Sequence, residues 1–213
     1  MLFSDRRDAG RRLGERLARL GLPAPVVLAL PRGGVAVAVE VARRLAAPLD
    51  LVLVRKLGVH GQEELAAGAV VEGEPPELVL NEAVVDAYGV APAYLETRKE
   101  AALRELARRR RLYLGERSRV PLGGRTAILV DDGIATGATA RAALLAVRRR
   151  GPRELVLAVP VATPEILDLL APAVDRLVCL DPDPDLISVG EHYQDFAQVE
   201  DEAVIAMLAE ARA

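Results

Sequence analysis

Two adjacent carboxylates, followed by a turn rich in glycine and threonine, are the residues of this chain best suited to chemistry. Asp131 and Asp132 come directly after the apolar run 126–130, and the turn at 133–139 leads into a segment of high helix propensity. Backbone N–H groups at a helix N-terminus lack partners and the helix dipole is positive there, which suits a phosphate. Ionised carboxylates only accept hydrogen bonds, which suits ribose hydroxyls. The pattern therefore predicts a ribose 5-phosphate site.

The predicted phosphate loop consists of Gly133, Ile134, Ala135, Thr136, Gly137, Ala138 and Thr139. It is not a P-loop, because Ala138 stands where that motif needs a lysine, and the chain has no GxGxxG dinucleotide fingerprint. The simpler alternative is an acidic strand end before a capped helix, but capping alone does not need this set of residues. Neighbouring strand residues point to opposite faces, so both acids reach one ribose only if the strand ends before them.

This string resembles the motif with which type I phosphoribosyltransferases bind 5-phosphoribosyl 1-pyrophosphate (PRPP). The resemblance covers most of the chain, since the turn at 31–34 and the Gly-x-x-Tyr-x-Asp-Phe segment at 190–196 are similar to those of uncharacterised bacterial phosphoribosyltransferase-like proteins. It implies a glycosyltransferase of nucleotide and nucleoside metabolism that moves phosphoribosyl from PRPP to a nitrogenous base or another small-molecule acceptor, releasing pyrophosphate. Mg²⁺ would bind mainly through PRPP, and we assign no metal-ligating residue.

The resemblance also assigns roles to residues outside the phosphate loop. Catalytic roles fall to Asp131 and Asp132, and to Arg55 and Lys56 at the entry of a mobile loop. The pyrophosphate loop would be Arg32, Gly33 and Gly34, and a hood over the base would present Leu186, Tyr193 and Asp195. Ordinary alternatives are a glycine turn that opens a helix, a solvated basic turn, and aromatic residues that pack in the core.

The acceptor stays open at this stage. Ala135 stands where the hypoxanthine and guanine transferases carry an acid, and Ala138 replaces a lysine common in that branch. The adenine and orotate branches also lack the acid, so activity is compatible with the sequence. A second hypothesis is a regulator on the same fold that senses PRPP or a nucleotide without converting it.

The overall composition excludes several other classes. With a net charge of −3, the chain lacks the positive field that non-specific nucleic-acid binding needs. No apolar run is long enough for a membrane span, and the N-terminus does not read as a secretory signal, so we expect a cytoplasmic chain without a membrane partner. Cys179 is the only cysteine, which excludes intrachain disulfides and cysteine-based zinc sites.

Alternating strands and helices predict an α/β fold, with a central parallel twisted sheet flanked by helices. Strands are expected at residues 26–30, 49–54, 126–130, 155–159 and 177–180, with a hairpin of 66–71 and 78–80. Helices are expected at 4–20, from the turn at 31–34 to about 46, and at 81–89, 92–112, 140–150 and 164–170.

We expect one domain over residues 1–213, because no repeat or long linker divides the chain. Within it, residues 181–200 and the N-terminal segment would form the hood, and residues 81–120 a helical insertion. The resemblance further favours a homo-oligomer, with a dimer as the expected form.

Overall fold

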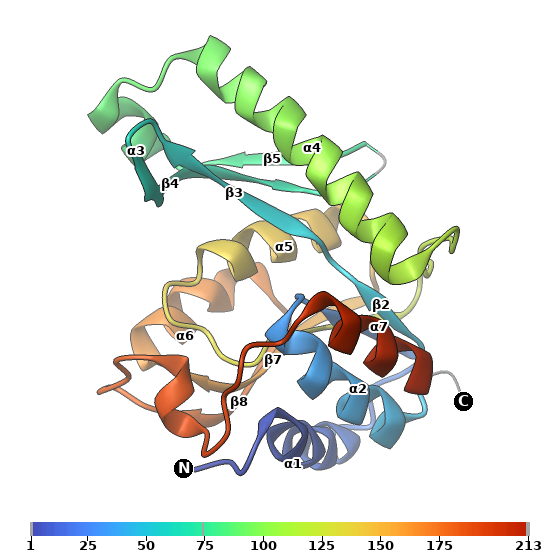
Figure 1. Cartoon of the computed structure of the whole chain (residues 1–213). Coiled ribbons are helices and arrows are strands. Elements are labelled where there is room, and N and C mark those ends of the chain that lie inside the picture. Colours follow the sequence, from blue (N-terminus) through green and yellow to red (C-terminus); the bar gives the residue numbers. More distant parts are fainter. Residues whose placement is uncertain (1, 74, 212–213) are drawn as a thin grey trace.

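The computed structural model of this protein describes residues 2–73 and 75–211. A parallel five-stranded sheet forms its centre, in the order β2-β1-β6-β7-β8 (Figure 1). The strands are β1 (Pro25–Ala29), β2 (Leu49–Leu51), β6 (Thr126–Val130), β7 (Glu154–Ala162) and β8 (Arg176–Pro182). The predicted α/β class with a central parallel sheet is confirmed.

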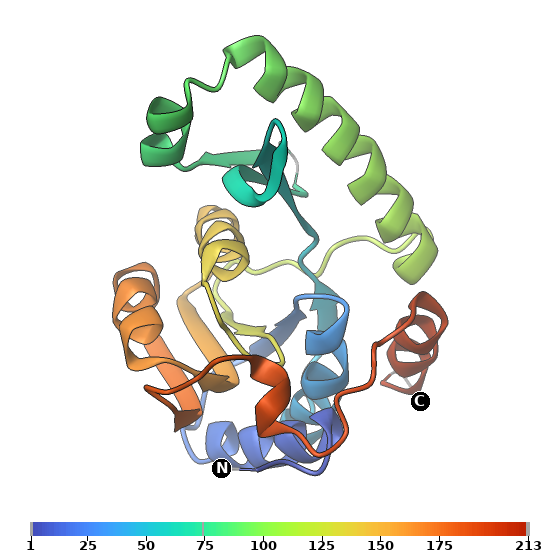
Figure 2. The same cartoon turned by 60° about the vertical axis from the view of Figure 1, so that its left-hand side comes forward.

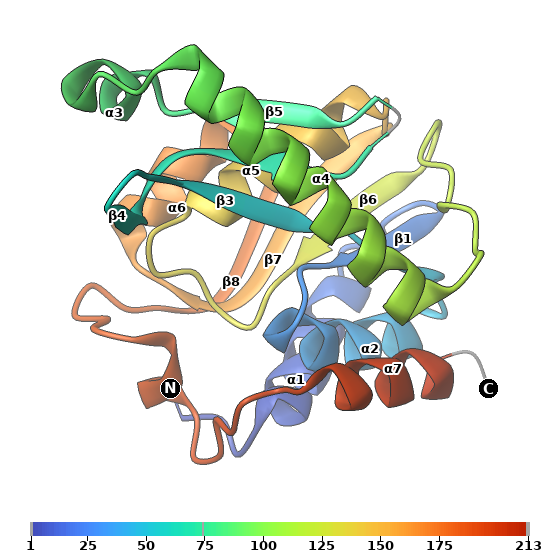
Figure 3. The ribbon, with the colours of Figure 1, turned by 45° about the horizontal axis from the view of Figure 1, so that its top comes forward.

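Helices cover both faces of this sheet (Figure 3). One face carries α1 (Arg6–Ala18), α2 (Gly33–Leu45) and α7 (Asp201–Glu210), and the other carries α5 (Ala138–Arg149) and α6 (Pro164–Leu170). Along β1, Val27 packs with the first group and Leu28 with the second, as the alternation of strand side chains requires. Because both faces are covered, the central strands are buried throughout, which explains their unbroken apolar runs.

A second, antiparallel sheet contains β3 (Val54–Val59), β4 (Gln62–Val71) and β5 (Glu77–Leu80). Its β4–β5 pairing confirms the predicted hairpin, whose turn includes residue 74 outside the described residues. The prediction of a loop from Arg55 onward was wrong. Lys56 pairs with Ala69 inside the sheet and Leu57 is buried, so only the tip between Val59 and Gln62 turns.

The predicted strand at 49–54 is divided between the two sheets. Its first part, β2, pairs with β1, and Val52 N–H still donates to the carbonyl of Ala29. From Val54 onward the chain pairs with β4 instead. The apolar run is continuous because residues 51–53 are buried all the way through the crossing, so hydrophobicity alone does not reveal the change of sheet.

The segment predicted to be a helical insertion packs on the small sheet. It contains α3 (Glu82–Tyr88) and α4 (Pro92–Leu114), both predicted. The small sheet lies between α4 on one side and α5 on the other (Figures 1 and 2). Leu95, Ala102 and Leu106 are buried at helical spacing on α4, which explains why a helix so rich in charge still packs along one side.

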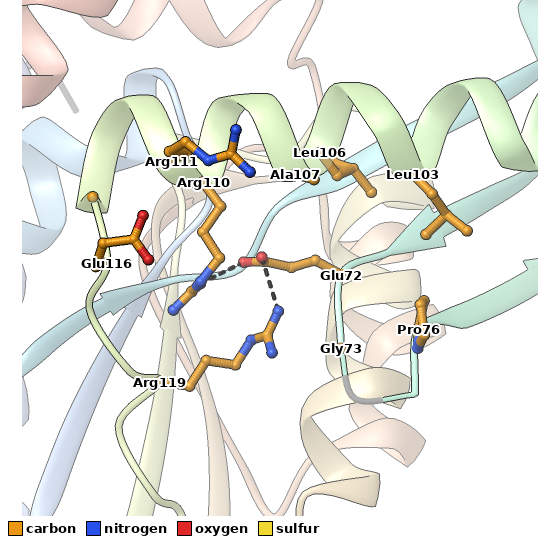
Figure 4. Close-up of a pocket in the computed structure, with 11 residues that line it drawn as sticks. Glu72, Gly73, Pro76, Leu103, Leu106, Ala107, Arg110, Arg111, Glu116 and Arg119 are labelled. Carbon is orange, nitrogen blue, oxygen red and sulfur yellow. Dashed lines mark hydrogen bonds and ion pairs between the residues drawn. The ribbon is translucent and has the colours of Figure 1, made fainter.

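A buried carboxylate anchors the C-terminal part of α4. Glu72 lies 2.9 Å from Arg110 and 3.2 Å from Arg119, and its side chain is 8% exposed (Figure 4). It also accepts from the backbone N–H of Leu53 at 3.3 Å. A cavity of 390 Å³ lies beside these ion pairs. The network joins the end of β4, α4 and the segment that leads into β6, so it holds the C-terminal part of α4 in place.

The N-terminal segment pairs with the chain around Tyr193. Phe3 N–H donates to the carbonyl of His192 and Gln194 N–H to the carbonyl of Phe3, both at 2.8 Å. The helix predicted at 4–20 is α1, and its N-cap is Asp5, since the Asp5 carboxylate accepts from the N–H of Asp8. Short 3-10 turns, η1 (Ala171–Ala173) and η2 (Val189–His192), complete the C-terminal part. The N-terminal segment and the predicted hood are therefore neighbours.

Candidate functional site

The two acids stand just beyond the carboxyl end of β6. The strand ends at Val130, so the alternation of strand side chains does not force Asp131 and Asp132 to opposite faces. The backbone N–H of Asp132 donates to Asp131 Oδ1 at 2.9 Å. Burial disfavours the charged form of Asp131, and the neighbouring charge of Asp132 adds to this, so the pKa of Asp131 lies well above its usual range.

The turn at 31–34 lies directly against these acids. A Cβ added to Gly33 would come within 1.9 Å of Asp132 Oδ2, and one added to Gly34 within 2.9 Å of Asp131 Oδ1. The Pro31–Arg32 peptide bond in this turn is cis. A side chain at Gly34 would meet the backbone of Asp131, and one at Gly33 would displace the Asp132 carboxylate. The predicted pyrophosphate loop and the two acids are therefore in close contact.

The predicted phosphate loop follows the acids and ends at α5. Gly137 is the N-cap of this helix with φ of 75°, and its carbonyl accepts from the N–H of Arg141 at 2.8 Å. The first backbone donors of α5 therefore follow the loop, where a phosphate would meet them. At the other end, a Cβ on Gly133 would come within 2.5 Å of Val189, which places the hood against the loop.

Lys56 lies across a cavity from the phosphate loop. The cavity has a volume of 460 Å³ and separates the small sheet from the start of α5. Its polar lining consists of Lys56, Asn81, Thr136 and Arg141. Arg55, the neighbouring strand residue, points to the opposite face of the sheet, so the structure brings only Lys56 of this pair toward the loop.

Of the three predicted hood residues, Tyr193 is the one that the structure joins to the acids. Its hydroxyl donates to the backbone carbonyl of Asp132 at 2.5 Å, and its ring packs between Phe3 and Phe196. The side chain is only 6% exposed, and burial raises the pKa of its hydroxyl. Leu186 is half-buried, and exposed Asp195 accepts from the N–H of Ala197.

Sequence reasoning missed the cation closest to the acids. Arg6 Nε donates to Asp132 Oδ2 at 2.7 Å. Arg32, which was predicted to bind pyrophosphate, pairs instead with Glu200 just before α7, at 3.3 Å. Arg6 and Asp132 are 126 residues apart, and no local pattern in the sequence signals that they meet.

Neither a membrane span nor a metal cage is found in the described part of the chain. Across residues 2–73 and 75–211, no helix combines the length and the apolar character needed to cross a bilayer. Over the same residues, no three side chains of His, Cys, Asp or Glu gather as a metal site.

Comparisons with known proteins give matches over most of the chain. The family model described as "Phosphoribosyl transferase domain" matches residues 7–195. The Mycobacterium tuberculosis protein "Putative phosphoribosyl transferase Rv0571c" is 48% identical over 207 residues, which are 97% of this chain and 46% of that protein. The chain therefore spans about half the length of the curated relatives that it matches.

Solved structures add a close and a distant neighbour. The crystal structure of TT1426 from Thermus thermophilus is 49% identical, with a TM-score of 0.84 over 99% of both chains. AQ2163 from Aquifex aeolicus shares the fold at 13% identity, with a TM-score of 0.52 over 84% of this chain and 74% of that one. The family match, the parallel sheet and the acid pair before a glycine loop lead to one conclusion: this chain belongs to the phosphoribosyl transferase family.

Proposed function

We propose that the chain binds PRPP and transfers its phosphoribosyl group to a small-molecule nucleophile, with release of pyrophosphate. The observation that carries this proposal is the junction of three elements at one edge of the sheet. Asp131 and Asp132 follow β6, the glycine turn at 31–34 lies against them, and the loop at 133–139 leads to the N-terminus of α5. PRPP matches this arrangement, because its ribose lies between a 5-phosphate and a 1-pyrophosphate.

Each element serves one part of the substrate in this proposal. The backbone donors at 135–139 bind the 5-phosphate, aided by the positive end of α5. Asp131 Oδ1 and Asp132 Oδ2 are held by the hydrogen bonds described above, which leaves the other oxygen of each carboxylate to accept from a ribose hydroxyl. The turn with Gly33 and Gly34 offers backbone donors to the pyrophosphate.

Transfer breaks the bond between C1 of the ribose and a pyrophosphate oxygen, and forms a bond from C1 to the nucleophile. Positive charge develops on the sugar ring as the leaving group departs, so nearby carboxylates favour the transition state over the ground state. When bound, Mg²⁺ would neutralise part of the pyrophosphate charge. It would be held mainly by PRPP oxygens, as expected for a cation that keeps few direct protein ligands.

The acceptor would be covered by the hood. Residues 189–193 stand beside the loop, because Val189 contacts the position of Gly133 and Tyr193 bonds to Asp132. Ala135 supplies no acid or base for proton transfer at the acceptor. An acceptor that is already nucleophilic, or that loses its proton to solvent, therefore suits this site better than one that needs an enzyme acid.

Two measurements test the proposal. Calorimetry with PRPP and Mg²⁺ should show saturable binding to the wild-type chain and none to a variant with both acids changed to Asn. A panel of purine, pyrimidine and amine acceptors should then release pyrophosphate in at least one case. Binding without release by any acceptor would support the regulator instead, and absence of PRPP binding by folded protein would overturn both.

A further inference from the structure

Arg6 connects three parts of the site that are far apart in the sequence. From the start of α1, its Nε donates to Asp132 Oδ2 at 2.7 Å and its Nη1 donates to the carbonyl of Ala197 at 2.9 Å. The Arg6 side chain is only 11% exposed and that of Asp132 16%. A pair this well covered is screened little by water, and it fixes both side chains.

The hood and the glycine turn shape the position of Arg6. Its guanidinium carbon lies 3.7 Å from the centre of the Phe196 ring, a cation–π distance. A Cβ on Gly33 would lie 3.1 Å from Arg6 Nε. The guanidinium therefore contacts both an aromatic ring of the hood and the turn assigned to pyrophosphate.

The charge of Arg6 acts on both acids. Two adjacent carboxylates repel each other, and this repulsion with burial raises the pKa of Asp131, whereas Arg6 lowers it. The charged or titratable groups that face Asp131 are Asp132 beside it, Arg6 on α1 and Tyr193 in the hood. Arg6 is the cation among them, so it favours the ionised form of Asp131.

We propose that Arg6 is a positioning residue of the PRPP site, which holds the Asp132 carboxylate toward the ribose and couples the hood to the acid pair. This inference rests on the proposed function, because it assigns Asp132 a ribose hydroxyl as its ligand. Arg6 acts through Asp132: it takes one carboxylate oxygen, so that the other faces the substrate. The hood takes part because Phe196 and Ala197 fix the guanidinium.

The test compares Arg6→Gln, Arg6→Lys and Arg7→Gln in the full chain. Arg7 is the matched control, since it lies next to Arg6 and pairs with Glu40 and Glu210, away from the acids. Calorimetry with PRPP and Mg²⁺ is run from about pH 5 to 8 on each protein, above the ordinary pKa of an aspartate. Thermal melts record stability separately.

We expect Arg6→Gln to weaken PRPP binding about tenfold or more and to move the acidic limb of the pH profile to higher pH. Arg6→Lys should recover part of the affinity, because it restores the charge without the fork geometry. Arg7→Gln should keep the wild-type affinity and pH profile. A melting temperature that falls while affinity and pH profile stay unchanged would reduce Arg6 to a structural role and overturn the inference. If the wild-type protein itself fails to bind PRPP, the proposed function fails first.

Discussion

The hydroxyl of Tyr193 donates to the backbone carbonyl of Asp132 at 2.5 Å, across 61 residues of sequence. The bond is partly buried and ties the backbone of Asp132 to the hood, so the conformation of the acid pair depends on the position of the hood. A second tyrosine makes a comparable bond elsewhere, because Tyr94 donates to the carbonyl of Gly58 at 3.0 Å. The two tyrosines allow a local effect on the site to be separated from loss of a hydrogen bond in general.

Tyr193→Phe should weaken PRPP binding as well as lower stability. Removing the hydroxyl leaves the Asp132 carbonyl without this donor, at a cost of about 1 kcal/mol in the free energy of unfolding. Tyr94→Phe should lower stability by a similar or smaller amount and leave PRPP affinity unchanged. Chemical denaturation and calorimetry on both variants give the comparison. Equal PRPP affinity in the two variants would show that the bond from Tyr193 to Asp132 does not affect PRPP binding.

Replacing the two acids one at a time should change stability in opposite directions. The pKa of Asp131 is raised by burial and by Asp132, so the folded chain binds this proton more tightly than the unfolded chain. The stabilising contribution is present below the unfolded pKa and is lost as the pH rises through the folded pKa. Ionised Asp131 therefore destabilises the unliganded chain at neutral pH, and Asp131→Asn should raise the melting temperature.

Asp132→Asn should instead lower the melting temperature, because it leaves Arg6 without its carboxylate partner in a covered position. Both variants should lose PRPP affinity, since each removes an ionised acceptor for a ribose hydroxyl. Melts at pH 7 and PRPP titrations decide the matter. A destabilised Asp131→Asn at pH 7 would contradict the assignment of a raised pKa to this acid.

The sequence was most informative where chemistry and backbone geometry depend on neighbours in the chain. The apolar run before Asp131 and the glycines after it are local, so β6 was predicted with its observed bounds and α5 to within two residues. Helix α7 was not predicted, although Val204, Met207 and Leu208 carry a helical spacing that could have revealed it.

Contacts between residues that are far apart in the sequence could not be predicted, because the tertiary fold creates them. Arg6 meets Asp132 only because α1 packs on α2 beside the acid loop, and Arg32 turns to Glu200 on a helix that was not foreseen. The family resemblance placed Lys56 at the entry of a mobile loop. Its strand forms because β4 supplies the partner, and a short sequence window does not contain that partner.

The ion pairs under α4 should matter for stability and not for PRPP. Glu72→Gln leaves Arg110 and Arg119 without this carboxylate at a site of 8% exposure, and should lower the free energy of unfolding by about 3 kcal/mol. The control is Glu100→Gln, whose ion pair with Arg104 is exposed and 3.9 Å long, so it should have little effect. Urea denaturation measures both. A loss of PRPP affinity in still-folded Glu72→Gln would show that the insertion influences the site.

Gly33→Ala tests the contact between the glycine turn and the acid pair. The new methyl group would lie 1.9 Å from Asp132 Oδ2, so either the turn or the carboxylate must move. Movement of the carboxylate breaks its bond to Arg6, and movement of the turn withdraws donors from the pyrophosphate. Either way, PRPP affinity should fall about tenfold or more.

Gly123→Ala is the control, because a Cβ there meets nothing within 4 Å and the backbone is not left-handed. Titration with PRPP and Mg²⁺ measures the affinity of both variants. Wild-type affinity in Gly33→Ala would show that the turn at 31–34 does not contribute to PRPP binding.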